Sequence, residues 1–291
     1  MPVISPPPWA NVVHVNSWLH KSFVPENIPI VATIHSCVHD SALGPYKGKL
    51  QSLYHRLWVK RCEKEMLGLA QAVTAVSQYT ADISADIFGR VDILPILNWS
   101  DTDGFRPDNR TALHVPFRLL FMGNMSRRKG ADLLPEIMRQ LGSDFVLRYT
   151  GTADEVDNCP SNMIPLGRLQ GTESILDAYR NCDALLFPTR LEGLPLTVLE
   201  ALASGRPIIT TDCCSLPEVV EHDVTGILCP IDDTVAFANA ARVLRDNPEM
   251  WLRMCVAARD KATTRFSEDN AIDSYFQLYT SLIADAELRS A

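Results

Sequence analysis

The sequence contains no apolar run long enough to span a membrane, and its start, MPVISPPPW, lacks the basic and then apolar pattern of a secretory signal. None of its eight cysteines forms a CxxC pair, and several fall inside apolar runs, where a thiol behaves as a small hydrophobic group. Basic residues are not in excess either, because 27 Lys and Arg stand against 35 Asp and Glu, a formal charge of −8. These absences predict a cytoplasmic protein with reduced thiols and no nucleic-acid partner.

Two phosphate-binding fingerprints are also missing from the sequence. GxxxxGK[ST] does not occur, which argues against a P-loop hydrolase, and GxGxxG does not occur, which argues against a classical dehydrogenase. The histidines show no spacing typical of metal ligands, so the sequence predicts no metal site.

The sequence does contain short apolar, β-branched runs that alternate with amphipathic segments. With 291 residues, 46% of them apolar, the chain can form one large or two ordinary cores. In the first part we expect strands at 11–15, 28–35, 72–77 and 91–97, and helices at 46–69 and 78–88. Strands that alternate with helices predict a parallel sheet in a layered α/β domain.

A polar stretch at 98–116, rich in proline, aspartate and asparagine, interrupts the alternation and is the candidate domain boundary. A second alternation follows. We expect strands at 117–123, 145–151, 163–167, 183–189, 207–211 and 226–230, and helices at 131–141, 174–182, 195–204, 216–221, 233–246, 248–265 and 268–288.

The stretch RLEGLPLTVLE, residues 190–200, is predicted to be the turn between a buried strand and a helix. The amides of Leu196 and Thr197 at such a turn are unpaired and carry the positive end of the helix dipole, which favours a phosphate. Glu192 and Glu200 flank this place, and carboxylates accept hydrogen bonds from hydroxyls. The pattern indicates a ligand with phosphate and sugar hydroxyls; the alternative is an ordinary turn with a capping glutamate.

The loop GNMSRRKG, residues 123–130, follows another strand and concentrates three cations in an acidic protein. Its terminal glycines allow close approach of a ligand, and Lys129 offers a point charge for a phosphate. His35 ends the strand IVATIH, where a side chain can project toward a ligand at the carboxyl edge of the sheet. A solvated loop and a packed histidine are the alternatives.

The predicted helix at 46–69 carries six cations among aromatic and leucine residues. It is either a solvated amphipathic helix or a peripheral contact with anionic headgroups or a lipid-linked substrate on the inner face of a membrane.

Taken together, these residues resemble a retaining glycosyltransferase of family 4, also called glycosyl transferases group 1, which has the GT-B fold. The resemblance is strongest from Phe117 to Pro230, through FMGNMSRRKG, DALLFPTRLEGLPLTVLEALASGRPIITTD and LPEVVEHDVTGILCP. The EG(x)6E core of that block is specific. The resemblance implies two Rossmann-like parallel-sheet domains that face each other across a cleft. We expect an acceptor-side domain at 1–108, a donor-binding domain at 109–266, and a C-terminal helix at 267–291 that crosses back to the first domain.

The same resemblance implies the role of each site residue. Glu192 would bind the donor sugar, Glu200 the ribose hydroxyls and Lys129 the diphosphate, while His35 would lie beside the transferred sugar and the segment at 168–169 near the base. His35, Glu192 and Lys129 would therefore be the catalytic set. The donor-binding set would be Gly123, Asn124, Arg128, Arg168, Leu169, Gly193, Leu194, Leu196, Thr197 and Glu200.

The sequence departs from the family pattern at several places. Asn124 stands where the family usually has arginine, and Cys214 and Ser215 stand where it usually has two glycines. Before residue 11 the family carries further strand-helix units of about 60 residues, so the first domain is expected to be incomplete. A β-branched edge left unpaired at 11–15 would make a homodimer one predicted outcome.

The resulting hypothesis is an enzyme that transfers a hexose, with retention, from a UDP- or GDP-sugar to a glycan or lipid-linked acceptor, as in polysaccharide or lipopolysaccharide biosynthesis. It would need no cofactor and no obligatory metal. The alternatives are a sugar-nucleotide epimerase of the same fold and a non-catalytic nucleotide-sugar-binding subunit.

Overall fold

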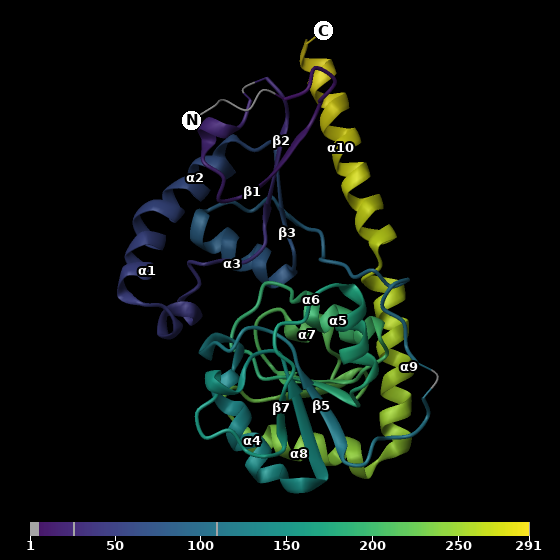
Figure 1. The fold of residues 1–291 in the computed structure, drawn as a ribbon. Helices are drawn as coiled ribbons and strands as arrows, with labels where there is room; N and C mark the ends of the chain where they lie inside the picture. The colour runs from purple at the N-terminus through teal and green to yellow at the C-terminus, as the bar shows by residue number, and fades with distance from the viewer. Residues whose placement is uncertain (1–5, 26, 109, 291) are drawn as a thin grey trace. The chain divides into compact units, whose positions relative to one another are not determined.

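The computed structural model describes residues 6–25, 27–108 and 110–290, and the chain divides into two compact units (Figure 1). The first unit contains the chain up to residue 98 together with the segment from 269 onward, and the second contains residues 99–268. The structure places the boundary between residues 98 and 99, ten residues before the boundary that the sequence predicted between 108 and 109. Residue 109 lies outside the described part.

The first unit is built on a parallel sheet of four strands in the order β1-β2-β3-β4. The strands are β1 (Val13–Asn16), β2 (Ile30–Ile34), β3 (Ala72–Ala75) and β4 (Ile93–Pro95). All five residues of β2 are buried. The inner strand β2 is therefore apolar at every position except Thr33, as expected for a parallel sheet that is covered on both faces.

The helical segment predicted at 46–69 is not one continuous α-helix. A 3₁₀ helix, η2 (Ser41–Tyr46), is followed by α1 (Lys49–Tyr54), the π-helical turn η3 (His55–Val59) and α2 (Lys60–Leu69). Gly48 caps α1 in an extended conformation, so the α-helix starts three residues later than predicted. Met66 and Leu67 of α2 join the core beneath the sheet, whereas α3 (Gln78–Phe88) matches its predicted range.

The second unit contains a parallel sheet of six strands in the order β10-β9-β8-β5-β6-β7. The strands are β5 (Phe117–Phe121), β6 (Phe145–Tyr149), β7 (Met163–Pro165), β8 (Ala184–Phe187), β9 (Ile208–Thr211) and β10 (Gly226–Cys229). The chain runs from β5 outward to β7 and then returns to the other side of β5 with β8. The strand order thus reverses between β5 and β8, where open parallel sheets bind ligands at their carboxyl ends.

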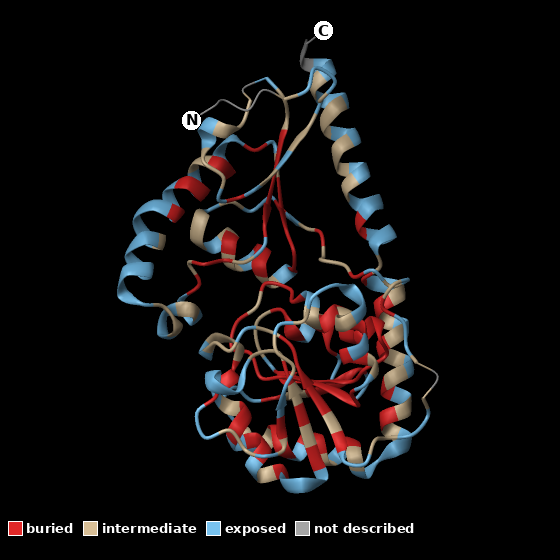
Figure 2. Cartoon of the chain, viewed as in Figure 1, coloured by how far each residue is buried: buried red, intermediate tan, exposed pale blue. Residues whose placement is uncertain are grey.

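The predicted α/β fold with two parallel sheets is confirmed, and the buried strands of both sheets are shown in red in Figure 2. Helices of the second unit pack around its sheet, and the core is dominated by the phenylalanines and leucines of the strands together with α4 and α8. These helices are α4 (Leu134–Leu141), α5 (Thr172–Arg180), α6 (Leu196–Ala203), α7 (Leu216–Val219), α8 (Thr234–Asp246) and α9 (Pro248–Arg265).

The last helix, α10 (Glu268–Ser290), belongs almost entirely to the first unit. The Tyr279 hydroxyl lies 2.6 Å from Nδ1 of His14, and Nε2 of His14 lies 2.5 Å from Oγ1 of Thr33 in β2. These contacts attach α10 to the first sheet. Within the described residues, no helix combines the length and apolar character needed to cross a membrane.

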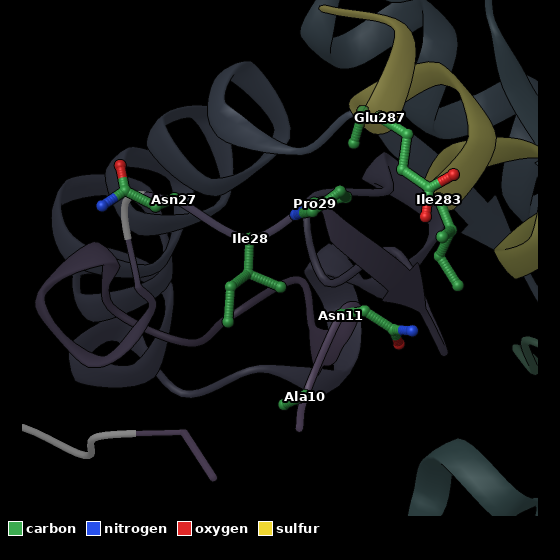
Figure 3. A pocket seen from close by; sticks show the side chains of 8 residues that line it. Ala10, Asn11, Asn27, Ile28, Pro29, Ile283 and Glu287 are labelled. Carbon is green, nitrogen blue, oxygen red and sulfur yellow. The ribbon is translucent and has the colours of Figure 1, made fainter. Parts of the chain in front are cut away.

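A hollow of about 450 Å³ lies in the first unit beside the amino ends of β1 and β2. Figure 3 shows Ile283 and Glu287 of α10 on one side of it and Asn11, Asn27 and Ile28 on the other. Among the described residues that line it, none is basic. Because it lies at the amino edge of the sheet and offers no cation, it does not resemble a phosphate site.

Candidate functional site

The candidate site of the second unit is formed by the two loops that follow β5 and β8 at the point where the strand order reverses. The loop after β5 contains the 3₁₀ turn η4 (Arg127–Lys129), and the loop after β8 leads into α6. The Arg190 amide donates to the Arg128 carbonyl at 2.9 Å, so the two loops are joined through their backbones.

The Glu192 carboxylate is the centre of this arrangement. Its Oε1 atom lies 2.7 Å from Lys129 Nζ and 3.0 Å from Arg128 Nη1, and it accepts a hydrogen bond from Thr189 Oγ1 at 2.9 Å. The side chain of Glu192 is only 9% exposed and that of Lys129 only 14%. A carboxylate buried to this extent is tolerated because two cations and a hydroxyl compensate its charge.

The Lys129 ammonium also lies 4.9 Å from the centre of the Phe187 ring, the last residue of β8. This cation–π contact places the positive charge at the carboxyl end of the strand. Arg128 and Lys129 therefore belong to a folded turn whose cations contact the neighbouring loop, which disfavours the alternative of a solvated basic loop at these two residues.

Gly130 makes this close approach of the loops geometrically feasible. Its φ of +72° is a left-handed conformation, and a Cβ atom at this position would collide with the Pro188 carbonyl. Arg190, whose side chain is only 5% exposed, binds Asp132 at 2.7 Å and Asp232 at 2.6 Å, which fixes the second loop from outside.

Helix α6 begins directly after Pro195, which has an extended ψ of 121° and serves as the N-cap instead of the first helical residue that the sequence suggested. The amides of Val198 and Leu199 reach the Pro195 carbonyl at 3.1 and 3.4 Å. Helix geometry leaves the amides of Leu196 and Thr197 without an intrahelical acceptor, and they carry the positive end of the helix dipole. This end of α6 is thus suited to an anion.

Glu200 lies on α6, half-buried, with one oxygen held by a tyrosine. Tyr179 Oη lies 2.8 Å from Glu200 Oε2 and 3.0 Å from the Thr197 carbonyl. Burial raises the pKa of the Glu200 carboxyl above its ordinary value, and the Tyr179 hydroxyl partly opposes that shift. Burial, followed by the charge of Glu200, raises the pKa of Tyr179 well above the usual range, so the tyrosine remains a proton donor.

A pocket of about 410 Å³ opens at the carboxyl ends of β5, β6 and β7 in the same unit. Gly123, Asn124, Arg168 and Leu169 from the predicted donor-binding set all line it. Thr150 fixes the backbone of Gly123 in the wall of this pocket. Its Oγ1 atom accepts a hydrogen bond from the Gly123 amide at 2.8 Å and donates one to the Gly123 carbonyl at 2.7 Å.

The remaining predicted residues have different environments. Leu194 is 4% exposed and Gly193 is also buried, so at these positions a ligand would meet backbone atoms, whereas the Leu196 side chain is 52% exposed. His35 follows β2 in the first unit, and partial burial of its ring lowers its pKa. The side-chain oxygen Oδ1 of Asn124 accepts a hydrogen bond from Ser126 Oγ at 2.8 Å.

Several residues that complete this site were not predicted from the sequence. Thr189 and Phe187 lie within the family-like stretch DALLFPT, at the end of a predicted strand. That position could have identified them as site residues. Tyr179 and Thr150 carried no signal, because each acts through a contact between elements that are distant in the sequence. Among the described residues, no three or more His, Cys, Asp or Glu side chains gather in a way that could hold a metal ion.

Residues 9–103 match the family model Glycosyltransferase Family 4, and residues 116–247 match Glycosyl transferases group 1. A glycogen synthase of Mycobacterium tuberculosis is 26% identical over 288 residues, which span 92% of this chain and 68% of that protein.

Two solved structures share the fold. A sucrose-phosphate synthase of Thermosynechococcus elongatus superposes with a TM-score of 0.78 at 20% identity, covering 94% of this chain and 74% of the other. The Anabaena protein HepE in complex with UDP superposes with a TM-score of 0.73 at 18% identity, covering 87% of this chain and 72% of the other.

The raised pKa of Glu200 leads to a prediction about stability. A carboxyl with a higher pKa in the folded than in the unfolded state binds its proton more tightly when folded, so stability falls as pH rises through the interval between the two values. At pH 7 to 8 we therefore expect Glu200→Gln to melt above the wild type, by roughly 2–4 °C for each kcal/mol recovered. Thermal melts from pH 4 to pH 8 should show the two curves converging at acid pH. A constant deficit of the variant at every pH would contradict the prediction.

Proposed function

The chain is a glycosyltransferase of the GT-B type, with a Glycosyltransferase Family 4 part and a Glycosyl transferases group 1 part, and on this premise we propose that it transfers a hexose from a UDP- or GDP-sugar to a glycan or lipid-linked acceptor with retention of the anomeric configuration. The observation that carries the proposal is the cluster of Lys129, Arg128 and Glu192, which is formed by the loop after β5, part of which lines the pocket, and the loop that leads into α6. The HepE structure contains UDP, and glycogen synthase is named for a glycan product. These two similar proteins support the proposal of a nucleotide-sugar donor and a glycan acceptor.

In the proposed reaction the donor lies across the second unit. The pocket lined by Arg168 and Leu169 would hold the base, and Glu200, whose Oε2 atom is held by Tyr179, would accept hydrogen bonds from the ribose hydroxyls with its other oxygen. The diphosphate would then meet the amides at the start of α6 and the Lys129 ammonium. Glu192 would accept hydrogen bonds from the sugar hydroxyls while remaining compensated by Arg128 and Thr189.

Transfer breaks the bond between the anomeric carbon and the diphosphate oxygen. With retention, the acceptor oxygen bonds that carbon on the face that the diphosphate leaves, and the proton of the acceptor hydroxyl passes to the departing diphosphate. The leaving diphosphate gains negative charge in the transition state. A fixed ammonium and fixed amides stabilise that charge more than the ground state, which is the condition for catalysis. We propose that these groups supply the positive charge without an obligatory metal ion.

The direct test of the proposed function is a calorimetric titration with UDP-, GDP- and ADP-sugars, followed by a transfer assay with a glycan or lipid-linked acceptor. We expect micromolar to millimolar binding of one donor class and a product that retains the anomeric configuration. Donor binding without transfer would favour a binding subunit, and nucleotide release that needs no acceptor would favour an epimerase.

For the ribose contact, we expect Glu200→Ala to remove most nucleotide-sugar affinity, because hydrogen bonds to a charged group contribute about 1.5–3 kcal/mol each. Affinity for inorganic diphosphate should change little, since it has no ribose. Calorimetry of both ligands measures the difference, and Glu173→Ala, an exposed carboxylate on α5, is the control. Unchanged affinity for the nucleotide sugar would refute the ribose assignment.

For the leaving group, Lys129→Ala should reduce turnover by about a hundredfold to a thousandfold, the usual scale for one fixed stabiliser of a developing oxyanion. Lys129→Arg should restore part of the rate, because guanidinium keeps the charge but differs in shape. Arg127→Ala is the control in the same loop, since Arg127 is exposed and pairs with Asp132. Equal rates for Lys129→Ala and Arg127→Ala would place Lys129 outside the reaction.

For the first unit, His35→Ala should slow transfer and leave donor affinity nearly unchanged. The reason is that His35 belongs to a different unit from the residues proposed to bind the donor. Steady-state kinetics and donor titration separate the two effects, and His222→Ala, an exposed histidine of the second unit, is the control. A loss of donor binding in the His35 variant would contradict this assignment.

A further inference from the structure

An apolar stripe lies exposed along the segment formed by α1 and η3. It consists of Leu50, Leu53, Tyr54, Leu57 and Trp58, whose exposed fractions are 85%, 43%, 56%, 63% and 55%. Steps of three and four residues place these side chains on one face of the helical segment. Isolated exposed apolar residues are common in proteins, but five large ones in a continuous row mark an interaction surface.

This stripe is not the face that holds the segment to the protein. The core contact is made further along, where Val59, Cys62, Met66 and Leu67 are buried. Figure 2 shows α1 in pale blue and the buried positions of α2 in red. The exposed row runs from Leu50 to Trp58, whereas the buried row begins at Val59 and continues along α2, so the two rows occupy different positions of the segment. The second apolar face is therefore not required for folding of the first unit.

Charge along the stripe is mostly positive, although Arg61 at its end pairs with Glu65 at 3.1 Å. Residues 41–62 contain five cations and no Asp or Glu, although the whole chain has a formal charge of −8. The cations are Lys47, Lys49, Arg56, Lys60 and Arg61. In the described part of the chain, Lys49, Arg56 and Lys60 form no ion pair, and all three are exposed. The His20 ring stacks on Trp58 with centroids 6.1 Å apart, which extends the surface toward the loop after β1.

We propose that this stripe and its cations dock onto the headgroup region of an anionic lipid bilayer. A helix with an apolar face and flanking lysines and arginines lies in the plane of the interface, with its apolar side chains at the boundary of the acyl chains. Tyr54 and Trp58 combine an apolar ring with a polar group, as is typical of residues at that depth. The uncompensated cations match the negative surface potential of anionic lipids.

A second copy of the chain fits this surface less well. In a symmetric dimer the same patch meets itself, so the exposed cations Lys49, Arg56 and Lys60 would face the same three cations of the second copy. A bilayer with anionic headgroups instead receives both the apolar row and the positive charge. The inference is independent of the proposed transfer reaction, because none of these residues belongs to residues 99–268, which contain the donor site.

The test is co-sedimentation of the full chain with phosphatidylcholine vesicles, with and without phosphatidylglycerol. We expect binding to the vesicles that contain phosphatidylglycerol, weakened by high salt and accompanied by a blue shift of tryptophan fluorescence. The apolar variant Leu53→Ser with Leu57→Ser and the charge variant Lys49→Gln with Arg56→Gln should each lower the partition coefficient roughly tenfold or more.

Matched controls remove similar exposed groups elsewhere. Val256→Ser with Phe276→Ser removes two exposed apolar side chains, and Arg253→Gln with Arg265→Gln removes two cations of α9. The controls should bind as the wild type does, and melting curves verify that every variant is folded. The proposal is overturned if the wild type ignores anionic vesicles, if the control pairs lose as much binding as the stripe pairs, or if the stripe variants only abolish self-association in the absence of lipid.

Discussion

The second unit depends on one buried carboxylate. Glu192 connects the loop after β5 with the loop after β8 because Lys129, Arg128 and Thr189 all contact its Oε1 atom. Two neighbouring strand ends are thereby fixed where the sheet order reverses, and the start of α6 is fixed with them. Without those cations the carboxylate would pay its full desolvation penalty, and without the carboxylate the two cations would repel each other across one small volume. The same mutual dependence holds a positive charge ready for a ligand.

The fold could largely be predicted from the sequence, since short apolar runs that alternate with amphipathic segments have few other solutions. α3 and α9 match their predicted ranges, while β5, β6 and β7 end two residues earlier than the apolar runs suggested. Those runs end in backbone turns such as Gly123, Gly151 and Gly167, which have positive φ and leave the ladder. The helix predicted at 46–69 is helical from Lys49 to Leu69: it starts later because Gly48 is extended, and it contains the π-helical turn His55–Val59, which the sequence pattern did not predict.

The site could be predicted only as far as local sequence determines it. Glu192, Lys129 and the start of α6 lie at strand ends, and topology brings strand ends together at one edge of the sheet. Tyr179 is different, because its role depends on α5 reaching α6 through a hydroxyl with two acceptors. The raised pKa of Glu200 likewise follows from burial in the folded state, which no sequence pattern reports. Burial makes the ionised form of the Glu200 carboxyl less favourable, a cost to stability of the kind that binding sites often carry.

Two groups of cations in this acidic chain illustrate how the same residue types take different roles. In the turn at 127–129, Arg128 and Lys129 are matched by Glu192, so their charge is local, oriented and partly buried. Such cations act on a small ligand at short range, where water is excluded. Along 47–61 most cations are exposed and lack carboxylate partners, so their field extends outward over about a Debye length. A field of that kind has little selectivity for one small molecule, but its attraction adds up over an extended anionic surface. The exposed apolar row beside these cations is therefore better explained by a bilayer than by a second substrate site.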